Sequence, residues 1–213
     1  MKHTLYTIGY AHHTQESFLE LLLKYHINCV IDVRTLPYST FHMQFNREII
    51  RDYLKARGII YIHMDEPFGI IKGDETLLGE DGYLDFIKLA RTKAFEEGVA
   101  RVENGLRKGY TISFMCAEKD PTNCHRSTLV GRAFSERGYK VAHILHDGTL
   151  ELHGQMEERM KEQYAPKENQ LHLFEKEVGE KERLEEAYVS CNREIFIVNA
   201  KRVLKDGYDY PKK

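Results

Sequence analysis

Three times along the chain, a helical pattern ends in a basic residue followed by glycine, and an apolar run rich in β-formers begins at once. These junctions lie at residues 57–61, 108–112 and 137–141. A glycine directly after a helix accepts the left-handed conformation that ends it, so each junction indicates a helix that leads into a strand. Because parallel strands need a crossover that is usually helical, the repeated pattern predicts a mostly parallel sheet.

Five segments have the character of strands, namely residues 4–9, 28–34, 59–65, 110–116 and 139–145. Helical periodicity occupies most of the intervals between them. We therefore expect a three-layer α/β fold, Rossmann-like or rhodanese-like, with about five mostly parallel strands and helices on both faces. The Gly-rich residues 68–82 are expected to form a loop or lid, and two helices are expected between residues 83 and 107.

The character of the chain changes after residue 150, so we expect an α/β domain over residues 1–150 and a helical, partly flexible extension over 151–213. Apolar residues at helical spacing indicate a first helix there: Leu152, Met156 and Met160. Residues 164–183 are charged and non-periodic, and a last helix is expected over 184–198.

The charges of the chain are nearly balanced, with 31 Lys and Arg against 33 Asp and Glu in 213 residues. This balance gives no general attraction to nucleic acid or to an anionic membrane. The N-terminal segment lacks the apolar region of a signal peptide, and no apolar run approaches the length of a membrane span. We expect a cytoplasmic protein without a membrane partner.

Polar residues gather where the expected strands end, which is the edge at which parallel α/β sheets bind ligands. The residues concerned are Tyr10 and His13 after the first strand, Asp32 and Arg34 after the second, and Cys116 and Glu118 after the fourth. Asp32 and Arg34 alternate on a strand and so point the same way. An arginine there can bind a carboxylate or phosphate through two hydrogen bonds, with the aspartate as orienting group or base. The alternative is a buried ion pair that only fixes the loop.

The strongest local signal is the run CAEKDPTNCHR, from Cys116 to Arg126. It predicts a strand, a tight loop containing proline, and a helix that starts near Asn123. A helix N-terminus attracts anions and lowers the pKa of a thiol. Cys124, with His125 and Arg126 beside it, is therefore a candidate thiolate or part of an anion site.

Two other roles fit the same run. In a structural role, Glu118 pairs with Arg126 and both cysteines pack inside. In a metal-binding role, zinc or iron is held by Cys116, Cys124 and His125, with a fourth ligand from His143 or His63. The Cys-x7-Cys-His spacing matches none of the usual paired zinc motifs, so the leading interpretation has no cofactor. The remaining cysteines, Cys29 and Cys191, lie in apolar patterns and are expected in the core.

The favoured function is an enzyme, a hydrolase or transferase, that acts on an anionic small molecule or nucleotide. Anion binding is assigned to Arg34 and Arg126, the nucleophile to Cys124 or Cys116, and acid–base chemistry to His125, Glu118 and Asp32. The walls of the pocket are assigned to Tyr10, His13 and Tyr38.

Taken in order, these motifs resemble the DUF488 family, a family of unknown function. The resemblance rests on residues 7–10 (TIGY), residues 32–34 (DVR) with Pro37 and Ser39, residues 44–46 (QFN), the run from Cys116 to Arg126, and residues 141–145 (VAHIL). It covers about residues 3–150 and implies an α/β fold with the same pocket, but no reaction. A looser similarity links the chain to rhodanese and cysteine-phosphatase folds, although the loop between Cys116 and Arg126 is longer than in those enzymes.

A short motif in the extension suggests another function. The pentapeptide QLHLF resembles the segment by which bacterial proteins bind the sliding clamp, and its anchors here are Gln170, Leu171, Leu173 and Phe174. If these side chains do not instead fold back on the core, the protein is an accessory of DNA replication or repair.

Overall fold

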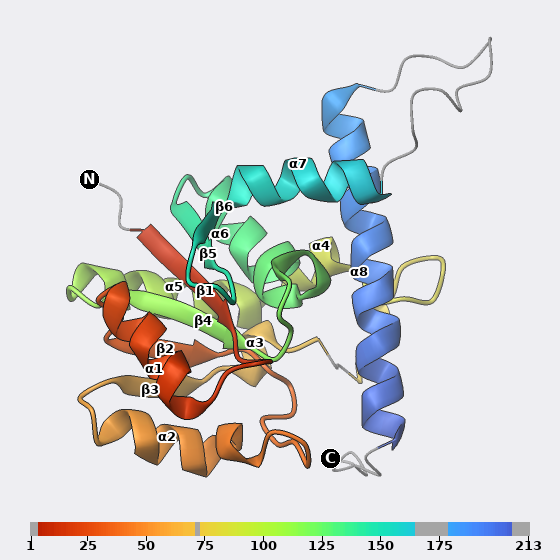
Figure 1. The fold of residues 1–213 in the computed structure, drawn as a ribbon. Coiled ribbons are helices and arrows are strands. Elements are labelled where there is room, and N and C mark those ends of the chain that lie inside the picture. The colour runs from red at the N-terminus through yellow and green to blue at the C-terminus, as the bar shows by residue number, and fades with distance from the viewer. Residues whose placement is uncertain (1–3, 71–72, 165–178, 206–213) are drawn as a thin grey trace, which may run out of the picture.

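A six-stranded sheet forms the centre of the computed structural model, which describes residues 4–70, 73–164 and 179–205 (Figure 1). The strands are β1 (Thr4–Gly9), β2 (Cys29–Asp32), β3 (Ile60–His63), β4 (Ile112–Cys116), β5 (Lys140–Ile144) and β6 (Leu150–Leu152). They lie in the order β3-β2-β4-β1-β5-β6, and every neighbouring pair is parallel except β5 and β6. The five expected strands and the mostly parallel sheet are confirmed, whereas β6 was not expected.

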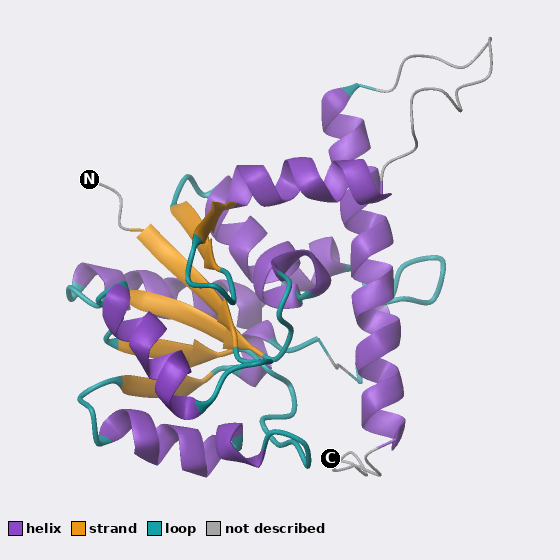
Figure 2. Ribbon diagram, in the orientation of Figure 1, coloured by secondary structure: helices purple, strands orange, loops and turns teal. Residues whose placement is uncertain are grey.

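Helices cover both faces of this sheet (Figure 2). They are α1 (Gln15–Lys24), α2 (Arg47–Lys55), α3 (Asp65–Phe68), α4 (Phe86–Ala90), α5 (Lys93–Arg107), α6 (Arg132–Glu136), α7 (His153–Tyr164) and α8 (Glu180–Lys205). Helices α1 and α2 pack on one face, and the others contribute to a second apolar cluster on the opposite face. Strand side chains alternate between the two clusters, as the pleat requires: Val30 joins the first, and Cys29 and Ile31 join the second.

The three helix-to-strand junctions have the expected conformation. Gly58, Gly109 and Gly138 have φ angles of 75°, 87° and 79°, in the left-handed region that side chains with a Cβ rarely adopt. Each of these glycines therefore ends a helix and turns the chain into the next strand.

The C-terminal extension packs against the α/β domain rather than standing apart from it. Met156 and Met160 of α7 are fully buried, and so are Tyr188 and Cys191 of α8, which belong to the second apolar cluster. In Figure 1, α8 runs along one side of the molecule and α7 lies across it. Leu152 was expected on the first helix of the extension, but it pairs with β5 as part of β6.

The Gly-rich segment was expected as a loop or lid. Its described part contains a short 3-10 turn (Glu75–Leu77) and an isolated bridge between Leu78 and Leu84. Arg193 of α8 forms an ion pair with Asp81, so this segment is held against α8.

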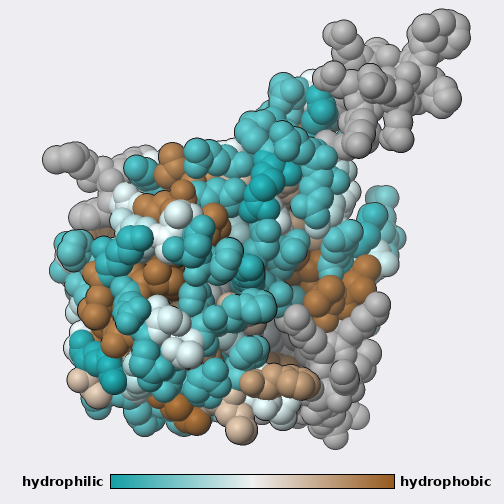
Figure 3. All heavy atoms as spheres, viewed as in Figure 1, coloured by the Kyte–Doolittle hydropathy of each residue, from teal (hydrophilic) through white to brown (hydrophobic). Residues whose placement is uncertain are grey.

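No helix among the described residues is both long and apolar enough to span a membrane. On the face seen in Figure 3, hydrophilic residues predominate and hydrophobic residues form small separate groups.

Candidate functional site

The ends of β1, β2 and β4 open onto a cavity of about 600 Å³. Seven of the predicted site residues line it: Tyr10, Arg34, Tyr38, Cys116, Glu118, Cys124 and His125. Each follows or ends one of these strands, or lies in the loops beyond them, at the edge of a parallel sheet where ligands bind. Three predicted residues, His13, Asp32 and Arg126, are not part of its lining.

The loop over residues 35–46 forms the outer wall of the cavity. Asn46 holds it in place, because its side-chain oxygen accepts a hydrogen bond from the backbone N–H of Ser39 at 2.7 Å. At its tip, the side chain of Phe41 is 82% exposed. Sequence reasoning missed Phe41, Asn46 and His42 as wall residues. The family-like motif at Pro37, Ser39 and residues 44–46 could have indicated these wall residues, because it lies in the same loop.

Arg34 is buried and almost fully hydrogen-bonded. Its Nε and Nη2 donate to the carboxylate of Asp32 at 2.9 and 2.5 Å, Nη2 also donates to the backbone oxygen of Phe45 at 2.9 Å, and Nη1 donates to the hydroxyl of Tyr10 at 3.2 Å. A guanidinium carries five N–H groups, so one N–H on Nη1 has no partner among the described residues, and Arg34 lines the cavity. Burial alone would lower the pKa of Arg34. The charge of the Asp32 carboxylate and its hydrogen bonds outweigh burial and raise the pKa above its ordinary value, so the group stays charged.

Asp32 is committed to this pairing. Besides Arg34, it accepts a hydrogen bond from the hydroxyl of Tyr61 at 2.5 Å, and its side chain is fully buried. The expectation that Asp32 acts as an acid–base group in the pocket does not match this geometry, since the carboxylate does not reach the cavity. Its position supports the other role considered for it, which is to orient Arg34.

Cys116, Cys124 and His125 form a compact group at the inner end of the cavity. Their two Sγ atoms and one imidazole nitrogen all lie within 4.8 Å of one another, and Cys116 Sγ is 3.9 Å from His125 Nδ1. His125 Nε2 lies 2.9 Å from the backbone oxygen of Val33. A carbonyl can only accept, so Nε2 carries the proton and Nδ1 presents its lone pair to the sulfur atoms.

Each of the two thiols affects the pKa of the other. The neighbouring thiol of Cys124, together with burial, raises the pKa of Cys116 well above its ordinary value. Burial alone would raise the pKa of Cys124, but the neighbouring thiol of Cys116 and the positive charge of Arg126 outweigh it and hold the pKa well below its usual range. The two shifts have opposite directions, so Cys124 ionises more readily than Cys116.

The chain around Cys124 differs from the expected helix start. Pro121–Asn123 form a short 3-10 turn, Cys124 is extended with φ −145° and ψ 132°, and a π-helical segment, Arg126–Gly131, leads into α6. Cys124 thus precedes the helix instead of lying in its first turn. Such π-helical turns are rare and occur frequently at functional sites.

Arg126 was predicted to bind an anion in the cavity, but it is not part of the cavity lining. Its side chain is fully buried, Nη1 donates to the backbone oxygen of Glu118 at 2.6 Å, and Nη2 donates to that of Lys119 at 3.3 Å. Its contact with Glu118 therefore runs through the main chain and not through the carboxylate. Gly9 permits this arrangement, because a Cβ there would lie 1.8 Å from the same Glu118 oxygen. Arg126 fixes the loop that carries the cavity residues.

The other predicted histidines lie elsewhere. The ring of His13 contacts the hydroxyl of Ser17 at 3.3 Å, away from the cavity wall. Nε2 of His63 lies 2.8 Å from the backbone oxygen of Arg34, and it donates there because a carbonyl can only accept. His143 belongs to a separate network. Neither His63 nor His143 joins the Cys116–Cys124–His125 group, so the expected fourth metal ligand is not supplied by them.

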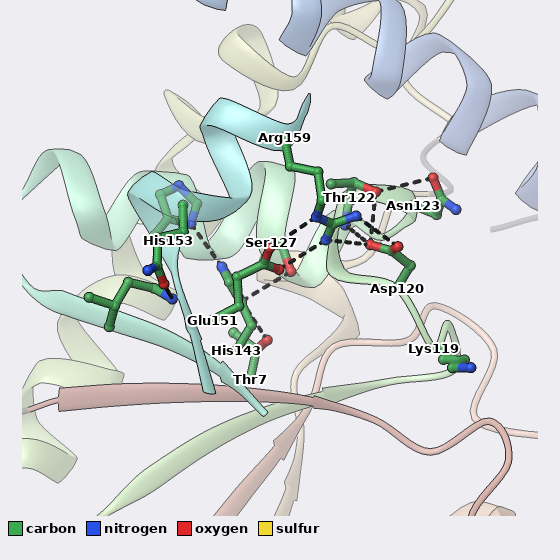
Figure 4. A network of polar contacts seen from close by, with 12 residues as sticks. Thr7, Lys119, Asp120, Thr122, Asn123, Ser127, His143, Glu151, His153 and Arg159 are labelled. Atoms are coloured by element: carbon green, nitrogen blue, oxygen red, sulfur yellow. Dashed lines mark hydrogen bonds and ion pairs between the residues drawn. The ribbon is translucent and has the colours of Figure 1, made fainter. Parts of the chain in front are cut away.

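A buried chain of hydrogen bonds runs behind the site. Thr7 Oγ1 contacts His143 Nδ1 at 2.8 Å, and His143 Nε2 contacts His153 Nδ1 at 3.1 Å (Figure 4). His153 Nε2 then contacts the Tyr188 hydroxyl at 3.1 Å, and that hydroxyl donates to Glu157 at 2.7 Å. Because the Tyr188 hydroxyl donates to Glu157, it accepts from Nε2 of His153. Nδ1 of His153 then accepts from Nε2 of His143, and Nδ1 of His143 accepts from Thr7. Each histidine carries one proton in this arrangement and is neutral. The chain joins β1, β5, α7 and α8.

Arg159 of α7 ties the extension to the cavity loop. Its guanidinium forms two hydrogen bonds of 2.9 Å with Asp120 and two of the same length with Glu151 of β6 (Figure 4). Asp120 also accepts a hydrogen bond from the N–H of Thr122, at the start of the 3-10 turn that precedes Cys124. The position of this turn therefore depends on α7.

Fold and site together define an α/β protein whose parallel strands end at a cavity lined by cysteine, histidine and arginine. The chain belongs to the family described as domain of unknown function DUF488, whose model matches residues 14–133. The match is narrower than the expected 3–150: it contains Arg34 and the run from Cys116 to Arg126, and it leaves out residues 7–10 and 141–145. A comparison with curated proteins and with solved structures found no match.

Proposed function

We propose that the cavity is the active site of an enzyme that acts on a small anionic, nucleotide-like substrate. One observation carries the proposal: Arg34, held rigidly by Asp32, keeps an N–H at the wall of a cavity that also contains the Cys116–Cys124–His125 group. An anion donor and a cluster of reactive side chains in one cavity are the two components that such an enzyme needs.

The donors for the anion are fixed before the substrate arrives. Two hydrogen bonds to Asp32 and one to Phe45 hold the guanidinium of Arg34, so binding a ligand costs little rotamer entropy. Burial raises the pKa of Tyr10, whose hydroxyl oxygen accepts from Arg34, and its own proton remains as a second donor at the wall. Since Asp32 balances the charge of Arg34, recognition rests on directed hydrogen bonds rather than on a large positive field.

The size and the rim of the cavity favour a nucleotide among anionic molecules. A volume of about 600 Å³ lies within the usual range for sites that take ligands of drug or nucleotide size. The exposed ring of Phe41 at the rim offers a face on which a base can stack. The phosphate would then lie toward Arg34 and the reactive group toward Cys124 and His125, where a hydrolase or transferase reaction takes place.

Titration of the full chain with adenosine monophosphate, followed by backbone amide NMR, tests the proposal. We expect the amide resonances of Arg34, Asn46 and Cys124 to shift together and to saturate. Tyr83, at the second cavity near α8, serves as the internal control and should not move. No saturable shift at Arg34 up to millimolar nucleotide would refute the proposal.

A pair of matched variants adds a second readout. Arg34→Lys removes the forked geometry while keeping the charge, and it should weaken nucleotide binding at least about tenfold in calorimetry. Arg193→Lys makes the same change at a partly exposed arginine that pairs with Asp81 outside the cavity, and it should leave affinity unchanged. Equal affinity for both variants would contradict the assignment of Arg34.

The sliding-clamp motif supports a second candidate function. Residues 170–174 lie outside the described residues, in the segment between α7 and α8. We propose, as the alternative, that this segment attaches the protein to the bacterial clamp through Gln170 and Phe174. In a binding titration, Gln170→Ala/Phe174→Ala should abolish clamp affinity, while His172→Ser, at the variable position of the motif, should retain it. Unchanged affinity in the double variant would end this alternative.

A further inference from the structure

We propose that Cys116, Cys124 and His125 bind one zinc ion whose fourth coordination position opens to the cavity. The zinc ion would be the reactive group of the active site proposed above. Only its catalytic use rests on that proposal, because metal binding can be measured whether or not the protein is an enzyme.

The three ligand atoms are already close to the required arrangement. Zinc lies about 2.3 Å from thiolate sulfur and about 2.0–2.1 Å from imidazole nitrogen, so tetrahedral coordination places sulfur and nitrogen about 3.6 Å apart and two sulfurs about 3.8 Å apart. Cys116 Sγ and His125 Nδ1 are 3.9 Å apart, and all three atoms lie within 4.8 Å. Coordination therefore needs movements of less than about 1 Å, which side-chain rotation alone can supply.

The surroundings of His125 match those of a metal-bound imidazole. Its Nε2–H is fixed on the backbone oxygen of Val33, which sets the tautomer and turns the Nδ1 lone pair toward the two sulfurs. Ligating histidines almost always donate their second N–H to a carbonyl or carboxylate in this way. A histidine that served only to fill space would not need its unprotonated nitrogen directed at two thiols.

The backbone also holds the ligands firmly. Cys116 ends β4 in the interior of the sheet, between β1 and β2. Cys124 and His125 are adjacent, yet the change from extended to helical backbone between them directs both side chains to the same point. Arg126 fixes the intervening loop through the carbonyls of Glu118 and Lys119.

The donor set favours zinc and an open site. Two thiolates and one imidazole select soft or borderline metals, and hard cations such as magnesium prefer oxygen. Three protein ligands with a free position are typical of catalytic zinc, whereas structural zinc takes four. All three ligands line the cavity, so the free position is reached from the substrate side. The ion would act there as a Lewis acid or bind the water that reacts.

The net charge of the zinc site would favour an anionic substrate. A zinc ion with two thiolates is neutral, and the buried guanidinium of Arg126 next to them leaves one net positive charge at the inner end of the cavity. This charge would be balanced by an anionic substrate or by hydroxide in the free position. The metal-loaded cavity therefore attracts an anion more strongly than the neutral Arg34–Asp32 pair can alone.

Metal analysis and cobalt substitution test the inference on the full chain. Purified protein should contain about one zinc per chain. After chelation, one equivalent of Co²⁺ should produce a thiolate-to-cobalt charge-transfer band and the visible bands of a tetrahedral ion, which the zinc form lacks. Chelated wild-type protein that takes up neither zinc nor cobalt would overturn the inference. This arm needs no variant, so misfolding cannot confuse it.

Variants then assign the ligands. Cys116→Ser, Cys124→Ser and His125→Ala should each weaken zinc binding by more than about a hundredfold, because even the loss of a partner behind a ligand costs ten- to a hundredfold. Cys191→Ser is the matched control: Cys191 is equally buried, its thiol contacts the backbone oxygen of Thr122, and a serine can keep that contact. Normal zinc content in Cys116→Ser/Cys124→Ser would place the metal elsewhere and refute the site.

The two proposals can fail separately. Bound zinc without any nucleotide-dependent shift at Arg34 would leave the metal site and remove the proposed substrate. Nucleotide binding by a protein that takes up no zinc would keep the enzyme proposal and return Cys124 to the role of a free thiolate.

Discussion

Asp32 and Arg34, two residues apart at the end of β2, form a fully buried ion pair in which Nη2 lies 2.5 Å from Oδ2. Their side chains are 0% and 5% exposed. The sequence left open a buried ion pair that fixes the loop. The structure has this pair, and Arg34 also lines the cavity. The aspartate positions the arginine, and the arginine lies in the cavity wall.

Breaking this pair should be costly. Asp32→Asn removes the charge that balances Arg34 in the interior, and we expect a loss of about 3 kcal/mol in the free energy of unfolding. Asp52→Asn is the matched control, because Asp52 pairs with Arg51 on the surface, where solvent screens ion pairs and their loss changes stability little. Urea denaturation at pH 7 compares the two. Similar losses in both variants would contradict the importance of burial.

A methyl group at Gly9 should disrupt the cavity. The new Cβ would meet the Glu118 backbone oxygen at 1.8 Å, so β1 or the cavity loop must move. We expect Gly9→Ala to lose stability strongly and to weaken both zinc and nucleotide binding. Gly154→Ala in α7 is the control, since no atom lies within 4 Å of the position that its methyl group would take, and it should be neutral or slightly stabilising.

Helix α8 should contribute to the stability of the whole α/β domain. Tyr188 is 1% exposed and packs under Arg132, whose guanidinium carbon lies 4.0 Å from the ring centre. Tyr188→Ala should cost about 3–5 kcal/mol, as for other large aromatic truncations in a core. Its neighbour Val189 is half-exposed, so Val189→Ala should cost little. A single cooperative urea transition is expected, and two separate transitions would show that α8 unfolds independently.

Stability should fall in mild acid because of the buried histidines. Burial, and then the charge of Arg132, lowers the pKa of His153 from 6.5 to about 4, and burial lowers the pKa of His143 as well. Between about pH 6.5 and 4 the unfolded chain binds protons that the folded chain does not. Stability therefore decreases as the pH falls through this window and is unaffected by these groups above it. His153 alone contributes on the order of 3 kcal/mol to this loss.

Comparison of variants isolates this effect from other titrating groups. His153→Gln keeps a neutral donor for Tyr188, so its unfolding free energy should depend less on pH than that of the wild type. His146→Gln, at an exposed histidine, should keep the wild-type profile. The carboxylate of Glu157 lies 3.5 Å from His153, and the pKa of the imidazole is lowered in spite of this neighbour. Identical profiles for wild type and His153→Gln would contradict the prediction.

Much of the fold follows from local patterns. Glycines after helices, β-rich runs and helical periodicity located five strands and most helices, because backbone conformation and amphipathicity are encoded within a few neighbouring residues. The short β6 was missed because three residues after a turn carry too little pattern, and Leu152 fits a strand and a helix equally well.

The residue types of the site could be predicted from the sequence, but their arrangement in space could not. Strand ends gave Tyr10, Arg34 and Cys116, because parallel strands bring their carboxyl ends to one edge. Arg34 and Arg126 looked equivalent in sequence. Only the packed structure shows that Arg126 lies outside the cavity lining and donates to backbone carbonyls, while Arg34 lines the cavity. A polar side chain in a loop has the same sequence signal whether its partner is a ligand or the chain itself.

The sequence by itself therefore determined the alternation of strands and helices and the residue types at the sheet edge. The tertiary structure decided the strand order, which places β4 between β2 and β1 and so brings Cys116 and Arg34 to one cavity. It also decided which polar groups are satisfied internally. The physical reason is range: backbone preferences act between near neighbours, whereas burial and hydrogen-bond partners depend on segments far apart in the chain.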